Sequence, residues 1–219
     1  DNYVQGYFVY DSKKAGAQTI SHLRFGPDPI YSTYLVQKAD FIASHQFKFI
    51  KKFNMIEDLK PGGTFLLNSP FSKDEIWDLL PAKVQEEIIK KEARFYVIDA
   101  SRVAQEANLG KRTNTILQTC FFAISGVLPK AEAIQKIKDA IVKSYSHKGD
   151  KVVKMNFNAV DQALANLFEV KYPKTVSSKQ AMLSVMTNTP DGFVKDVLEV
   201  ILSGNGDELP VSAFSVDGT

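Results

Sequence analysis

Two adjacent lysines, Lys13 and Lys14, are the residues of this sequence with the clearest potential for ligand chemistry. They follow the aromatic and β-branched run 7–10 and the pair Asp11-Ser12, a pattern typical of a strand that ends in a tight turn. Two cationic side chains on one turn suit a phosphate group better than they suit packing. A solvated surface turn is the simpler interpretation of the dipeptide alone, and both interpretations stay open at this point.

Two asparagines further along the chain occupy positions where an anionic ligand could bind. Asn114 follows Lys111 and Arg112 at the start of an apolar helix expected over 113–125, and a helix N-terminus attracts anions. Asn156 precedes another expected helix. Each asparagine could instead be a plain helix cap, which is the simpler interpretation from sequence. Arg112 is a candidate on charge and position only.

The other reactive side chains favour structural roles. His22, Arg24 and His45 lack a partner nucleophile or an identifiable carboxylate pair for acid–base work. Cys120 is the only cysteine and lies in an apolar run, so we expect a buried thiol and no cysteine-based iron–sulfur or zinc site. The segment 62–64 lacks the Gly-Lys-Ser/Thr ending of a phosphate-binding loop.

Alternating strand and helix patterns indicate an α/β fold for the first half of the chain. Such alternation predicts a parallel sheet with helices on its faces. The expected strands are 4–10, 20–25, 39–44, 64–68 and 94–99, and the expected helices are 47–59, 72–80 and 81–91. In the second half we expect helices over 100–107, 113–125, 129–145 and 193–202, an extended segment over 150–155, and a helix capped by Asn156 or Asn158.

The fold expected overall is a three-layer α/β/α sandwich with a mainly parallel sheet and a helical C-terminal extension. We place the α/β domain at 1–170 and the extension at 171–219, where one helix and a linker would lead to a further domain.

Composition sets the remaining limits. The chain has 219 residues, of which 44% are hydrophobic, and a formal net charge of +2, so nothing in its charge points to nucleic acid. No apolar run approaches the roughly 20 residues that span a bilayer, and we expect no membrane partner. A single cysteine and no recognisable signal peptide favour a cytoplasmic location.

Motifs spread over almost the whole chain carry a family resemblance. The opening segment 10–16 (Tyr-Asp-Ser-Lys-Lys-Ala-Gly) leads into 21–26 (Ser-His-Leu-Arg-Phe-Gly). The sequence thereby resembles domain III, the gamma-type domain, of the pyruvate:ferredoxin (flavodoxin) oxidoreductases in the 2-oxoacid:acceptor oxidoreductase family. Residues 15–17 depart from the Ser-Gly-Gly that is common in that family. Further matching segments are 29–36, 62–65, 67–70, 95–100, 118–122, 126–129, 153–156, 159–163 and 209–214.

The resemblance implies a role in coenzyme A binding. Lys14, Asn114 and Asn156 match coenzyme A contacts of the family, and Lys13 is the neighbour of the first. The parent reaction would be the oxidative decarboxylation of pyruvate with coenzyme A to acetyl-CoA, with electrons passed to ferredoxin or flavodoxin. Thiamine diphosphate and 4Fe–4S clusters are expected elsewhere in a homodimeric parent. This piece alone would then show no turnover, and its partners would be other domains of the same polypeptide.

Two alternatives remain. The chain could be a non-catalytic packing module that supports neighbouring domains or a dimer interface. It could also be the related domain of a sulfite reductase flavoprotein, without pyruvate chemistry.

Overall fold

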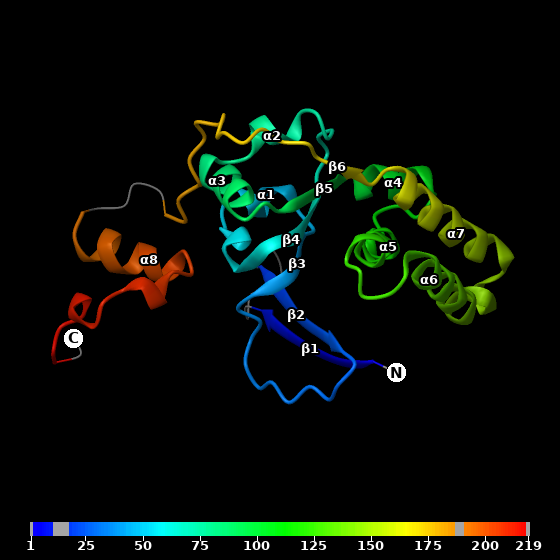
Figure 1. Cartoon of the computed structure of the whole chain (residues 1–219), viewed down its shortest axis with the longest axis horizontal. Coiled ribbons are helices and arrows are strands. Elements are labelled where there is room, and N and C mark those ends of the chain that lie inside the picture. The colour runs from blue at the N-terminus through cyan, green and yellow to red at the C-terminus, as the bar shows by residue number, and fades with distance from the viewer. Residues whose placement is uncertain (1, 11–17, 187–190, 218–219) are drawn as a thin grey trace.

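The structure, a computed structural model, describes residues 2–10, 18–186 and 191–217. Its centre is a four-stranded sheet in the order β3-β4-β5-β6 (Figure 1). β3 (Ala39–Ser44), β4 (Leu59–Asn68) and β5 (Arg94–Ile98) are parallel, and the short β6 (Phe168–Glu169) is antiparallel to β5. The mainly parallel sheet is therefore confirmed, together with an antiparallel edge strand that the sequence patterns had not indicated.

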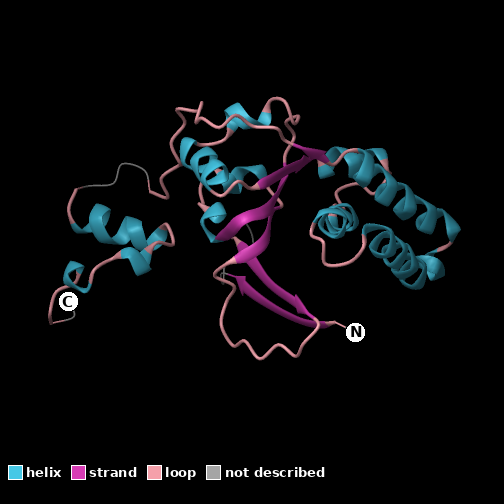
Figure 2. Ribbon diagram, in the orientation of Figure 1, coloured by secondary structure: helices cyan, strands magenta, loops and turns pink. Residues whose placement is uncertain are grey.

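Helices cover both faces of this sheet because neighbouring strand residues point to opposite sides. Phe65 and Phe95 stack at 5.3 Å on one face, against α1 (Phe47–Ile50), α2 (Ile76–Leu79) and α3 (Ala82–Lys90). The other face packs through Leu66 and Ile98. Its helices are α4 (Ala100–Glu106), α5 (Asn114–Ile124) and α7 (Asp150–Ala165), with α6 (Lys130–Tyr145) outside them (Figure 2). This is the expected three-layer sandwich.

The helix predicted over 47–59 is wrong in its length. α1 ends at Ile50, a separate 3-10 turn covers Met55–Asp58, and β4 already begins at Leu59. A buried lysine fixes the 3-10 turn, since Lys91 Nζ donates hydrogen bonds to the carbonyl oxygens of Ile56, at 2.7 Å, and of Glu57. These carbonyls are thus satisfied without a continuing helix.

Residues 61–63, which lie between the expected helix 47–59 and the expected strand 64–68, lie inside β4 as a bulge. Ala39 pairs with Leu59 but Phe41 pairs with Thr64, so β4 holds surplus residues opposite β3. A Cβ on Gly63 would lie 2.7 Å from Leu59 Cδ1 and 2.8 Å from a backbone oxygen. The bulge therefore needs glycine there.

The extended segment predicted over 150–155 is also wrong. α7 begins at Asp150 and runs unbroken to Ala165, so Asn156 and Asn158 are interior helix residues and not caps. The pair Val152-Val153 suggested a strand, but tertiary packing overrides that local preference. Val153 and Val160 bury against α6, and Ala159 and Ala163 bury against the sheet side of the layer.

The first two strands form a separate hairpin. β1 (Tyr3–Tyr10) and β2 (Thr19–Gly26) pair antiparallel, as a two-stranded sheet that projects from the body (Figure 1). The ring of Phe25 lies 5.9 Å from the ring of Phe121 and connects the base of the hairpin to α5. The predicted strands are present, but they are not part of the parallel sheet.

Beyond β6 the chain crosses the body without regular structure. The N–H of Ala82 donates to the carbonyl of Gln180 at 2.8 Å, and the N–H of Leu183 donates to the carbonyl of Lys51 at 2.7 Å. A last helical segment follows as Val194–Leu198, with π-helical hydrogen bonding, and α8 (Glu199–Leu202). The expected final helix is thus present. None of the helices in the described residues has the length and apolar character that crossing a bilayer requires.

Candidate functional site

Lys13 and Lys14, the leading candidates, lie outside the described residues. The flanking strand ends are described: Tyr10 and Thr19 are cross-strand partners in the hairpin. The strand before the lysines belongs to this hairpin and not to the parallel sheet. The rule that open α/β sheets bind ligands beyond the carboxyl ends of their strands therefore gives no support to a site at the lysine pair.

Asn114 is the first residue of α5 and is exposed. Thr113, not Asn114, occupies the N-cap position, and its side chain makes no capping hydrogen bond. The first turn of the helix contains no acidic residue, and the preceding Lys111 and Arg112 are both exposed. The start of α5 thus offers backbone N–H groups, an amide side chain and two cations to solvent, a combination that suits an anion.

Asn156 has a different setting, because it is buried in the middle of α7 with 4% of its surface exposed. Its Nδ2 donates a hydrogen bond to the carbonyl oxygen of Val152 at 2.9 Å. Among the described residues Oδ1 has no hydrogen-bonding partner. Asn156 can therefore present an acceptor oxygen and its second amide hydrogen to a ligand.

The structure brings the helices of these two asparagines together. Ile116, Leu117 and Cys120 of α5 share one buried cluster with Ala159 and Ala163 of α7. The two helices lie side by side on the same face of the sheet (Figure 1). Asn114 and Asn156 do not contact each other through a hydrogen bond, so a ligand that joined them would bridge the two helices.

A hollow of about 470 Å³ beside α7 went unpredicted. It lies where α4 ends, at Ala107 and the left-handed Asn108 (φ 58°). Lys151, Lys154 and Asn158 line it from α7, together with Met155. The Lys-x-x-Lys spacing is one helical turn and could have indicated this cationic face, had 150–155 been expected to be helical. Neither Asn114 nor Asn156 lines the hollow.

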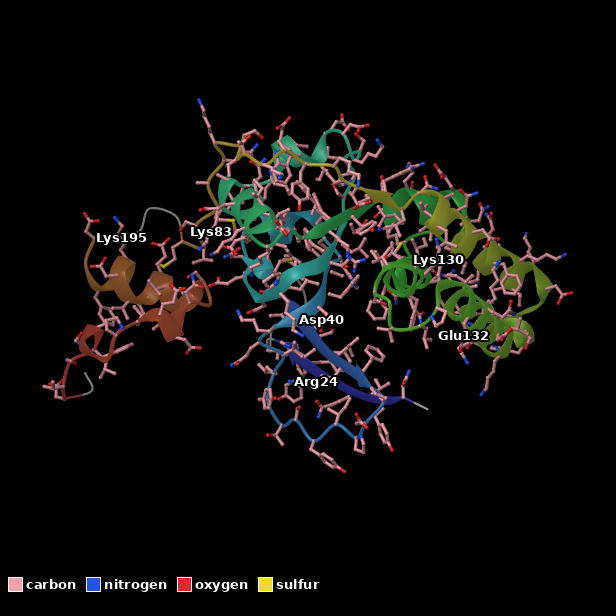
Figure 3. The ribbon with its side chains drawn as sticks, viewed as in Figure 1. Arg24, Asp40, Lys83, Lys130, Glu132 and Lys195 are labelled. Atoms are coloured by element: carbon pink, nitrogen blue, oxygen red, sulfur yellow. The ribbon has the colours of Figure 1, made fainter. Side chains whose placement is uncertain are left out.

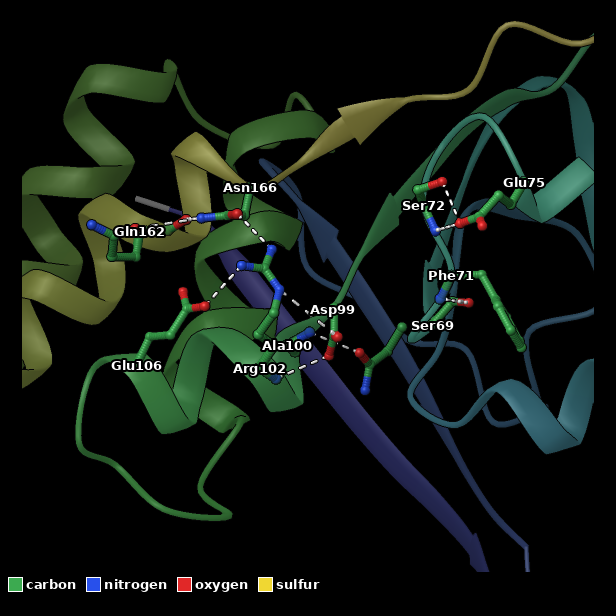
Figure 4. Close-up of polar contacts among 11 residues, drawn as sticks. Ser69, Phe71, Ser72, Glu75, Asp99, Ala100, Arg102, Glu106, Gln162 and Asn166 are labelled. Carbon is green, nitrogen blue, oxygen red and sulfur yellow. Dashed lines mark hydrogen bonds and ion pairs between the residues drawn. The ribbon is translucent and has the colours of Figure 1, made fainter.

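Polar groups at the carboxyl ends of the parallel strands are occupied by one another. Asn68 ends β4, and its Nδ2 donates to the carbonyl of His45 while its Oδ1 accepts from the N–H of Ala100, both at 2.9 Å. Asp99 follows β5 and accepts from the N–H of Arg102 at 2.9 Å as the cap of α4 (Figure 4). The polar side chains at the carboxyl ends of β4 and β5 therefore bond to neighbouring segments of the protein, and few of their hydrogen-bonding groups remain for a ligand.

Arg102 extends these contacts to α7. Its guanidinium bonds to Glu106 Oε1 at 2.9 Å and to Asn166 Oδ1 at 2.8 Å (Figure 4). The pairs are exposed, so they orient α4 against the end of α7 more than they stabilise the fold.

His22 and Arg24, expected to be structural, hold the loop that follows the hairpin. Val36 N–H donates to His22 Nδ1 at 3.2 Å, and Arg24 donates to Gln5 Oε1 at 2.8 Å and to the carbonyl of Tyr34 at 2.6 Å. Arg24 lies on the hairpin below the main sheet (Figure 3).

His45, the third residue expected to be structural, is partly removed from solvent, and this burial lowers the pKa of its imidazole.

Cys120 is fully buried in α5, and burial raises the pKa of its thiol to about 12. The thiol therefore stays protonated at neutral pH and is a poor nucleophile. Within the described part of the chain, no group of three or more histidine, cysteine or acidic side chains is arranged to hold a metal ion.

The fold is that of an α/β domain whose candidate polar residues lie in one helix layer, and the comparisons with known proteins add the family. Residues 1–166 match the family described as pyruvate ferredoxin/flavodoxin oxidoreductase. The chain belongs to this family. Residues 178–219 match a second family, described as a domain of unknown function.

Curated relatives agree over nearly the whole chain. A pyruvate-flavodoxin oxidoreductase of Rhodospirillum rubrum is 54% identical over 98% of this chain. A pyruvate:ferredoxin oxidoreductase of Moorella thermoacetica is 51% identical over all of it. The chain spans only 18% and 19% of the length of these relatives. These names do not favour the sulfite reductase alternative.

A solved structure supports the fold. The pyruvate oxidoreductase subunit PORC of Thermotoga maritima matches with a TM-score of 0.57, covering 78% of this chain and 83% of that one. The identity is 17%, so this likeness bears on the architecture alone.

Proposed function

We propose that this chain is one region of a pyruvate:ferredoxin or flavodoxin oxidoreductase and that it contributes to coenzyme A binding in the conversion of pyruvate to acetyl-CoA. The single observation that carries the proposal is the identity of about one half, over nearly the full chain, to relatives named for that activity. Electrons would pass to ferredoxin or flavodoxin, and the location would be cytoplasmic.

The chemistry of the candidate residues supports the coenzyme A role. Coenzyme A carries a pyrophosphate, a 3′-phosphate and amide groups, which suit lysines, backbone N–H groups and amide side chains. Lys14, with Lys13 beside it, would contact a phosphate. Asn114 and Arg112 lie at the start of α5, where no side chain caps the helix. Asn156 lies in the neighbouring helix α7, and its Oδ1 has no hydrogen-bonding partner among the described residues.

These residues would act by binding and orientation. Holding the nucleotide at several points fixes where the thiol end of the ligand can reach, which lowers the entropy cost of the acyl transfer. Thiamine diphosphate and 4Fe–4S clusters, when bound in the parent protein, would supply decarboxylation and electron transfer. The residues of this chain would take no direct part in either step.

The test uses the full-length polypeptide that contains this sequence. Reduction of flavodoxin or ferredoxin should require both pyruvate and coenzyme A, and its absence would contradict the proposed activity. Calorimetry with coenzyme A on an Asn114→Ala variant then tests the binding role. Loss of about one hydrogen bond should raise Kd roughly three- to tenfold. Lys136→Ala on α6, whose side chain is exposed, is the control and should leave Kd unchanged.

A further inference from the structure

The β1–β2 hairpin exposes large apolar side chains on both of its faces. On one face these are Tyr3, Tyr7, Val9 and Ile20, and on the other they are Val4, Phe8, Tyr10 and Leu23. Tyr7 and Phe8 are 58% and 59% exposed, and Tyr10 is 74% exposed. A soluble domain rarely shows apolar groups gathered in this way unless they bind something.

The hairpin has little support from the rest of the chain. Among the described residues each strand has a neighbour on one side only, and a lone two-stranded sheet is at best marginally stable in water. Phe25 contacts Phe121 at the base. The loop after the hairpin covers part of one face, where Gln5 Nε2 donates to the carbonyl of Ser32 at 2.6 Å. In Figure 1 the hairpin lies below the main sheet, and the N-terminal end of β1 is the part farthest from that sheet.

The few charged residues on β1 and β2 limit the kind of surface that can bind the hairpin. β1 contains no charged residue, and β2 contains only His22 and Arg24. Both of these already bond to the hairpin or its loop. On the described strands the exposed side chains are mainly aromatic and aliphatic, so the surface that meets them should be apolar and uncharged.

The exposure of both faces argues for an enclosing partner. A second hairpin that paired edge to edge with β1 would extend the sheet but leave both faces in water. A flat surface would cover one face. Only a body that surrounds the hairpin on two sides buries all eight side chains, and the relatives hold more than four fifths of their length outside the matched stretch.

We infer that the hairpin is a docking arm that inserts between apolar surfaces contributed by parts of the parent polypeptide outside these 219 residues. This inference rests on the proposed function, because that function makes the chain one region of a longer protein. The arm would fix this domain relative to the remaining domains through aromatic packing, and its edge strands would be available to pair with a further strand.

The experiment is site-specific photo-crosslinking in the full-length polypeptide. Benzoylphenylalanine replaces Tyr7 on one face, Phe8 on the other, and Lys136 on the polar surface of α6 as the control. After irradiation, mass spectrometry identifies the crosslinked peptides. Both hairpin positions should crosslink to segments outside the 219 residues, with a several-fold lower yield from position 136.

Crosslinks from one hairpin to the hairpin of a second copy would overturn the inference, and so would the absence of crosslinks at positions 7 and 8. Crosslinks from only one of the two positions would overturn the enclosed arrangement. Pyruvate- and coenzyme A-dependent turnover is measured on the same preparations. If turnover is present but the expected crosslinks are absent, the docking role of the hairpin is wrong and the proposed activity stands. If the crosslinks form but turnover is absent, the proposed activity is wrong and the docking role stands.

Discussion

Asn156 Nδ2 donates a hydrogen bond to the carbonyl oxygen of Val152, 2.9 Å away within α7. This contact fixes the orientation of a side chain that is almost fully buried. Its Oδ1 therefore has a set direction before any ligand arrives, which reduces the entropy lost on binding. The geometry makes Asn156 a rigid acceptor, in contrast to the exposed Asn114.

Asn156→Ala should weaken coenzyme A binding in the full-length polypeptide. Removing one neutral hydrogen bond to a ligand costs about 0.5–1.5 kcal/mol, or roughly a three- to tenfold rise in Kd by calorimetry. Asn166→Ala is a matched control, because Asn166 makes the same type of bond to Gln162, at 2.9 Å, at the end of the same helix. An equal loss of affinity in both variants would show that the effect comes from the helix and not from ligand contact.

Gln85→Ala should destabilise the protein and loosen the segment after β6. Gln85 is fully buried, and its Oε1 accepts from the N–H groups of Ser177 and Ser178 at 2.9 Å, while its Nε2 donates to the carbonyl of Trp77 at 2.6 Å. Unpaired buried groups cost about 1–3 kcal/mol, which should appear as a lower urea midpoint and faster amide exchange at 177 and 178.

The control for Gln85 is Gln135→Ala. Within the described part of the chain the Gln135 side chain bonds to Asp139 alone, on the exposed surface of α6, and such a pair contributes about 0.2–0.5 kcal/mol. If the two variants unfolded at the same urea concentration, Gln85 would not be the anchor of this segment.

Cys120 should not react with thiol reagents in the folded protein at neutral pH. Burial holds its pKa near 12, against an unfolded value of 9.0, so the folded state keeps the proton across that interval. Its contribution to stability is therefore fully present below pH 9 and is lost as the pH rises towards 12. Cys120→Ala should unfold with a weaker pH dependence over this window, and rapid labelling of the native wild type at pH 7.5 would contradict the burial.

The sequence patterns predicted the sheet well because its strands are continuous apolar runs, such as 65–67, that separate helices. They failed where a distant residue decides local structure. Lys91 donates hydrogen bonds to the carbonyls of Ile56 and Glu57, which lie 35 and 34 positions earlier in the chain, and fixes a 3-10 turn within the segment expected as one helix. In the same way, packing on α6 makes a helix of a Val-Val segment that by itself favours a strand.

For the site, sequence motifs identified Asn114 and Asn156 as candidates but described both as possible caps. Which partner each amide uses depends on helix boundaries, and those are set by tertiary packing. The two lysines facing the hollow beside α7 were missed for the same reason. That Lys13, Lys14, Arg112, Asn114 and Asn156 bind coenzyme A stays a prediction.

The central claim is tested most directly by the dissociation constant of coenzyme A for Lys14→Ala in the full-length polypeptide. A lysine–phosphate contact is a charge-assisted hydrogen bond of about 1.5–3 kcal/mol, so Kd should rise roughly 10- to 100-fold by calorimetry. Lys136→Ala, which removes an exposed lysine of α6, provides the charge-matched control. An unchanged Kd in Lys14→Ala, or an equal rise of Kd in both variants, would contradict the claim that Lys14 binds a phosphate of coenzyme A.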